Sequence, residues 1–172
     1  MASLMENLID VLDNECREYE NLLKLSEQKT PIIVKGDLEE LARITDEEQL
    51  AVSRINHIET SRKEVFADIA NVINKDVNTL KLGDLVDMLN KRPEEQQKLA
   101  KAHDRLRTVV RAVKSVNEQN RELIKSAMEM VDFNLNMLQA MKTAPETANY
   151  NKGAYNVGMT MGIPKSGFDA KQ

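Results

Sequence analysis

Three long stretches of the chain carry apolar side chains every three or four positions, which is the spacing that places them on one face of an α-helix. The stretches cover residues 4–30, 37–74 and 93–141. In the third stretch the spacing continues for almost the whole length, as it does in coiled coils. The pattern therefore predicts an all-α fold, an elongated antiparallel helical bundle or coiled coil of three long helices.

Proline, glycine and capping residues mark the expected ends of these helices. Pro31 lacks an amide donor and disfavours helix at the residue before it, so the first helix is predicted to kink or break there, with a turn at Gly36. Asp37 has the character of an N-cap, and Glu40 three residues later completes a capping-box pattern. Pro93 suits the first turn of the third helix, where its missing amide would have had no partner.

Two segments lie outside the long helices. Residues 79–90 carry a short apolar pattern and are expected to form a helical corner. The last thirty residues, 143–172, hold four of the six glycines and two of the four prolines, so we expect a flexible tail without a core of its own. Its scattered aromatic and methionine side chains leave docking on the third helix or on a partner open. The predicted organisation is a helical body over residues 1–142 followed by this tail.

The apolar face of the third helix widens after Asn120. Beyond this residue the column beside the seam is also apolar, so the apolar arc covers about 160° of the helix at 100° per residue. A single helix hairpin cannot cover such an arc, and an uncovered apolar face usually marks an interaction site. The alternative, that the first helix or a second copy covers it, stays open. The predicted partner-binding residues are Asn120, Leu123, Ile124, Ala127, Met128, Met130, Val131, Asn134, Leu135, Met137, Leu138 and Met141.

Asn120 and Asn134 also interrupt the seam itself, at positions where a buried asparagine can fix the register of a coiled coil. In the second stretch, Glu48 and Arg62 interrupt the seam and are expected to pair or to extend toward solvent at the edge of the bundle.

Composition and charge narrow the function further. Aromatic residues make up only 3% of the chain, which argues against a β-sheet fold. The net charge of −4 offers no excess of cations for nucleic acid. No apolar run is long enough to span a membrane, and Cys16 is the only cysteine, as expected of a protein in a reducing compartment. We therefore expect a cytoplasmic protein without a membrane span or a nucleic-acid partner.

Candidate catalytic and metal-binding residues are scarce. His57 and His103 are the only histidines, and neither has a second histidine or a cysteine at the spacing that a zinc site requires. Cys16 lies on the apolar seam of the first helix, where it is expected to act as a small buried hydrophobic residue. These observations predict no metal, no cofactor and no enzymatic activity.

Several segments resemble a known family. Residues 116–124, VNEQNRELI, and residues 130–138, MVDFNLNML, resemble the C-terminal helix of FlgN-type flagellar export chaperones. Residues 35–41, KGDLEEL, resemble the turn before the second helix of that family, and the final residues FDAKQ resemble the tails of its Gram-positive members. The order of elements is similar over nearly the whole chain.

The resemblance implies a cytoplasmic chaperone that works without ATP and holds the hook-filament junction proteins, the first and third hook-associated proteins, before type III export. Family members are thought to bind the C-terminal helical segment of the client with their own C-terminal region, which corresponds here to residues 120–141. It leaves the flagellar export apparatus as a further candidate partner, and we expect a monomer or a weak dimer. The alternative is a coiled-coil scaffold that dimerises through the wide apolar arc and has no exported client.

Overall fold

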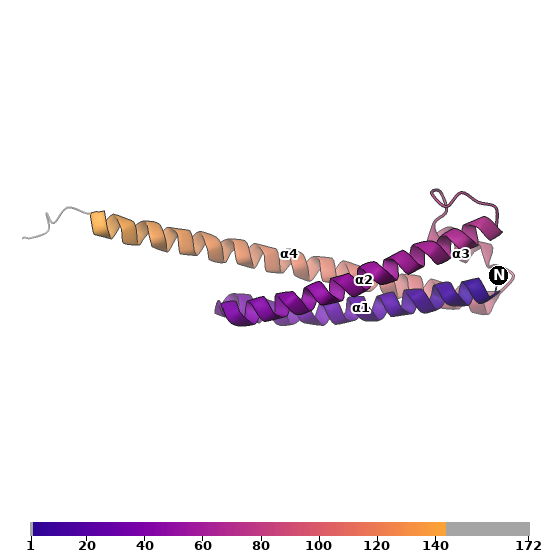
Figure 1. Cartoon of the computed structure of the whole chain (residues 1–172), viewed down its shortest axis with the longest axis horizontal. Coiled ribbons are helices and arrows are strands. Elements are labelled where there is room, and N and C mark those ends of the chain that lie inside the picture. Colours follow the sequence, from indigo (N-terminus) through magenta and orange to yellow (C-terminus); the bar gives the residue numbers. More distant parts are fainter. Residues whose placement is uncertain (1, 144–172) are drawn as a thin grey trace, which may run out of the picture. The chain divides into compact units, whose positions relative to one another are not determined.

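The computed structural model describes residues 2–143, and four helices make up nearly all of this range. They are α1 (Ala2–Lys35), α2 (Leu38–Val72), α3 (Leu82–Met88) and α4 (Pro93–Thr143) (Figure 1). The described residues contain no strand, which confirms the predicted all-α class. From residue 144 onward, the predicted tail lies outside the described residues. The chain divides into two compact units, with the boundary after Ala127.

The connection between α1 and α2 forms as the local sequence predicts. Gly36 has a φ of +70°, a conformation that residues with a Cβ rarely adopt. Asp37 Oδ1 then accepts a hydrogen bond from the amide of Glu40 at 3.1 Å, which confirms Asp37 as the N-cap of α2. The carboxylate of Glu40 pairs with Arg43 at 2.7 Å. Only the Asp37 half of the expected capping box is therefore present.

The predicted break at Pro31 is wrong, because α1 continues through Pro31 to Lys35. A proline inside a helix removes one backbone hydrogen bond and costs about 3 kcal/mol. Ile33, two residues beyond Pro31, is only 7% exposed, and its burial favours the continuation of the helix. Packing of this side chain therefore outweighs the local preference of the sequence. Just before the proline, Thr30 Oγ1 donates to Asn120 Oδ1 of α4 at 2.7 Å and holds that turn of α1 against α4.

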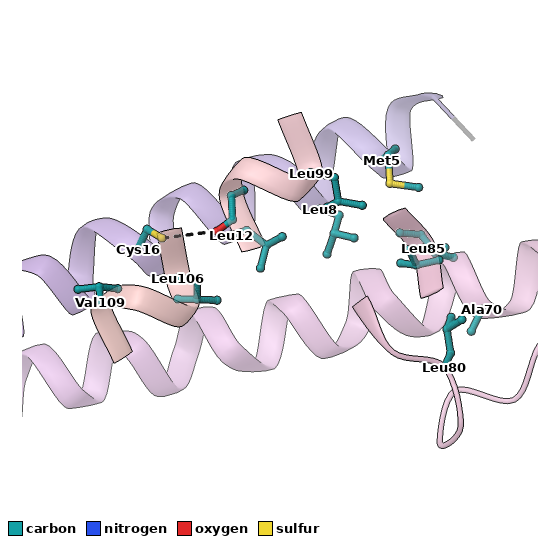
Figure 2. Close-up of a cluster of buried hydrophobic side chains, with 12 residues drawn as sticks. Met5, Leu8, Leu12, Cys16, Ala70, Leu80, Leu85, Leu99, Leu106 and Val109 are labelled. Carbon is teal, nitrogen blue, oxygen red and sulfur yellow. Dashed lines mark hydrogen bonds between the residues drawn. The ribbon is translucent and has the colours of Figure 1, made fainter. Parts of the chain in front are cut away.

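Two apolar clusters form the core of residues 2–127. The larger one joins all four helices, and it includes the fully buried Leu8 and Cys16 of α1 and Leu99 of α4 (Figure 2). The second cluster joins the other half of α1 to α2 and α4. α1 therefore packs against both α2 and α4, and its buried apolar residues include Met5, Leu8, Leu22 and Leu25.

Polar contacts give the relative directions of the helices. Glu18 binds Arg54 at 3.0 Å and Lys29 binds Glu48 at 2.7 Å, so α2 runs antiparallel to α1. Residues of α1 meet α4 in increasing order along both helices, from Cys16 near Ala102 to Ser26 near Asn120. These contacts describe a helical bundle. No helix within the described range has a stretch long and apolar enough to cross a membrane.

Candidate partner-binding site

The last part of α4 carries large apolar side chains that no other described residue buries. Each of them is between 48% and 68% exposed. At 100° per residue they fall within about half of the helix circumference, and the polar Asp132, Asn136 and Gln139 lie on the other half. We call this set the apolar strip; it consists of Met128, Met130, Val131, Leu135, Met137, Leu138 and Met141.

The twelve predicted partner-binding residues fall into three groups by exposure. Asn120 is buried, and Leu123 and Ile124 are half-buried. The other nine are exposed: Ala127, Met128, Met130, Val131, Asn134, Leu135, Met137, Leu138 and Met141. The environment of the apolar arc therefore changes along α4, from a buried residue at Asn120 to exposed residues beyond Ile124.

Asn120 connects α4 to α1 rather than facing solvent. It is 4% exposed, and its Nδ2 donates to the carbonyl oxygen of Ser26 at 2.8 Å. Its Oδ1 accepts from the hydroxyl of Thr30 at 2.7 Å. Both polar ends of the side chain are thus used inside the protein, which agrees with the predicted role in fixing register and removes Asn120 from the surface that a partner could touch.

Phe133 is an exposed residue that the predicted site did not include. It is 65% exposed and lies about 40° around the helix from Met137, at the edge of the apolar strip. The predicted seam omits it because the seam follows a three-and-four spacing, and Phe133 falls between the seam and the polar half. The sequence could have indicated Phe133, because it is an aromatic residue between two polar neighbours in a chain with only 3 phenylalanines.

Charged side chains at the interface of α1 and α2 are paired, as predicted for Glu48 and Arg62. Glu48 accepts hydrogen bonds from Ser26 Oγ and Lys29 Nζ, each at 2.7 Å. Arg62 Nε lies 2.9 Å from Glu15 Oε2, an ion pair without the angle of a hydrogen bond. Because Glu15 is 2% exposed, burial raises its pKa; Arg62 opposes this shift and Glu59 adds to it.

Cys16 has the environment of a packing residue. It is fully buried in the larger cluster, and its thiol contacts the carbonyl oxygen of Ala102 at 3.9 Å (Figure 2). Burial raises the pKa of this thiol, against the opposing effect of Arg105. The prediction of a small buried hydrophobic residue is confirmed. Within residues 2–143, no three His, Cys, Asp or Glu side chains are grouped so that they could hold a metal ion.

A helical bundle with a long apolar strip exposed on one helix is typical of proteins that recognise amphipathic partner segments. The comparison with protein families agrees with this class. The family model described as FlgN protein matches residues 1–156, so the chain belongs to the FlgN family. This is a family of flagellar export chaperones, and the chain is accordingly a chaperone of flagellum biogenesis.

One curated relative is similar over almost its full length. It is the "Uncharacterized protein YvyG" of Bacillus subtilis (strain 168), which is 28% identical over 169 residues. The alignment covers 95% of this chain and 96% of the relative. No solved structure is significantly similar to the chain.

Proposed function

We propose that the apolar strip of α4 binds the C-terminal helical segment of hook-filament junction proteins in the cytoplasm. Binding keeps these hook-associated proteins unassembled and competent for export. In this proposal α4 is one of three long helices that form an elongated antiparallel bundle, and the flagellar export apparatus receives the loaded chaperone. The observation that carries the proposal is the exposure of seven large apolar side chains on one half of the helix over residues 128–141.

The chemistry of the strip suits a helical client. Apolar residues at helical spacing match the i, i+3, i+4 and i+7 anchors of an amphipathic helix that lies along a groove or face. Four of the seven residues are methionines, whose flexible and polarisable side chains adapt to clients of different sequence. The strip could therefore accept more than one junction protein.

The expected energetics suit a chaperone that must release its client. Burying one large apolar side chain contributes about 1.5–3 kcal/mol. Ordering a disordered client segment costs about 2–5 kcal/mol or more, which offsets part of this gain. The net affinity is therefore moderate, and a competing surface can release the client without hydrolysis of ATP.

The proposal is tested with a fluorescent peptide that corresponds to the C-terminal segment of a junction protein. We expect Val131→Asp and Leu138→Asp each to weaken binding by at least about tenfold, because a carboxylate placed in the interface loses its hydration. Asn136→Asp is the matched control: it adds the same charge at an exposed position on the opposite half of the helix. This control should bind the peptide as the wild type does.

Unfolding and light-scattering measurements distinguish a loss of client binding from a loss of folding and from dimerisation. None of the three variants should change the urea midpoint, because all three side chains are exposed. Loss of folding in Val131→Asp or Leu138→Asp would show that the strip is part of the core. A tight dimer that ignores the peptide, and that both substitutions dissociate, would favour the coiled-coil scaffold instead.

A further inference from the structure

A second surface feature lies within residues 2–127, where α2 faces the connection that leads into α3. Here a pocket of about 390 Å³ opens to solvent. Its volume lies near the lower end of the range of roughly 300–1,000 Å³ that is usual for ligand pockets. It can therefore receive a few side chains rather than a large ligand. We call it the basic groove; it is lined by Arg62, Lys63, Phe66, Val77, Leu80, Lys81 and Leu82.

The floor of the basic groove is apolar and anchored in the core. Leu80 is 7% exposed and belongs to the larger apolar cluster (Figure 2). Phe66 and Leu82 are half-buried and pack against the same cluster. Val77 is 41% exposed and offers its apolar surface to solvent. Because its floor is continuous with the core, the groove presents a preformed apolar contact.

The rim of the groove is positively charged, whereas the chain as a whole is negatively charged. Three cations and no carboxylate line it, although the net charge of the chain is −4. Arg62 is held by Glu15, whereas Lys63 and Lys81 form no ion pair with any described residue. On the α3 side, the carboxylate of Asp84 accepts from the backbone amide of Lys81 at 2.8 Å, and Asp84 does not line the groove.

From this combination we infer that the basic groove binds an acidic amphipathic segment of a partner protein. Apolar side chains of the segment enter the floor, and its carboxylates pair with Lys63 and Lys81. Charge complementarity selects this occupant, because two unpaired ammonium groups beside an apolar floor fit carboxylates that flank apolar anchors.

The groove fits other anionic partners less well. Each lysine near an anionic membrane contributes only about 1 kcal/mol, and membrane binding needs a cluster of about 4–8 such residues. Nucleic acid likewise depends on many phosphate contacts. The basic groove is also distinct from the proposed client site, since the groove and the apolar strip share no residue and belong to different units.

The test uses the full-length protein and a labelled model peptide of about 14 residues with Leu at helical spacing and Glu at the remaining positions. We expect Lys63→Glu/Lys81→Glu to weaken binding by at least about tenfold and added salt to weaken wild-type binding. Val77→Asp should weaken it as well. Arg17→Glu/Lys24→Glu, with the same change in charge at two exposed positions of α1, should bind as the wild type does.

Three further measurements decide between outcomes. Val131→Asp/Leu138→Asp should still bind the acidic peptide, because that double substitution alters only the apolar strip. If a scrambled peptide of the same composition bound equally well, binding would depend on charge alone and not on the spacing of the apolar side chains, and the inference would be overturned. It would also be overturned if phosphatidylserine vesicles, but not the peptide, bound the wild type and lost binding in Lys63→Glu/Lys81→Glu.

Discussion

At the scale of single residues, Asn120 and Asn134 show how one residue type acquires two roles on one helix. They lie two heptads apart on the same side of α4, so the sequence pattern treats them alike. The structure separates them, because Asn120 bonds to Ser26 and Thr30 of α1, whereas Asn134 is exposed. The position of α1 relative to α4 makes this difference, and that position cannot be read from the spacing within α4.

Replacement of each asparagine by alanine measures this difference. Asn120→Ala should lower the free energy of unfolding by about 1–3 kcal/mol, because the Thr30 hydroxyl and the Ser26 carbonyl lose a buried partner. Asn134→Ala should change it by less than about 0.5 kcal/mol, as is usual for an exposed position. Urea unfolding followed by circular dichroism gives both values. Equal effects of the two substitutions would contradict the assigned role of Asn120.

Glu15 provides a prediction about pH. Burial raises its pKa above the usual value of 4.5, so the folded chain holds this proton to higher pH than the unfolded chain does. Its contribution to stability is complete below that usual value and is lost as the pH rises through the raised pKa. Glu15→Gln removes this titration. Relative to the wild type, the variant should therefore gain stability as the pH increases above 4.5.

Urea unfolding of both proteins at several pH values from about 4.5 to 8 measures this change. The difference between the two proteins at a single pH also contains the altered pairing of Arg62, so the diagnostic quantity is the slope of the difference with pH. A flat difference, or one that falls with rising pH, would contradict a raised pKa for Glu15.

At the scale of helices, local chemistry fixes where α2 and α4 begin, whereas long-range packing carries α1 past Pro31. Asp37 caps α2 through its own side chain, and Pro93 is the first residue of α4, as its missing amide allows. Both positions could be predicted because the interactions lie within one turn. The extension of α1 past Pro31 could not be predicted in this way, because it depends on the burial of Ile33 against other parts of the bundle.

The cost of Pro31 can be measured directly. Its side chain is exposed, so Pro31→Ala loses little packing and restores the amide that the helix lacks. Loss of the proline also raises the conformational entropy of the unfolded chain, which lowers the free energy of unfolding by about 0.4–1 kcal/mol. We expect a net increase of about 2 kcal/mol in the free energy of unfolding, which is the helix penalty of about 3 kcal/mol less this reduction. A decrease would mean that the proline supports α1 at this position.

At the scale of the whole molecule, the core and the proposed client site use different parts of the chain. The buried residues end at Asn120, and none of residues 121–143 is buried. The widening of the apolar arc could be predicted from spacing alone, since helical geometry assigns each residue its place on the circumference. The residue at which α4 changes from buried to exposed could not be predicted from spacing. It depends on how far along α4 the contacts with α1 extend, and the hydrogen bonds of Asn120 to α1 mark that point.

This separation predicts that the bundle is stable without the client site. A chain shortened to residues 1–127 keeps every buried residue of the described structure. It should therefore unfold cooperatively, with a free energy of unfolding within about 0.5 kcal/mol of the full chain, while its affinity for the junction-protein peptide is lost.

Binding of the acidic model peptide to the shortened chain should persist, because the basic groove is retained. Urea unfolding and fluorescence anisotropy on the same sample measure all three quantities. Retained affinity for the junction-protein peptide would place the client site on the bundle instead of the apolar strip.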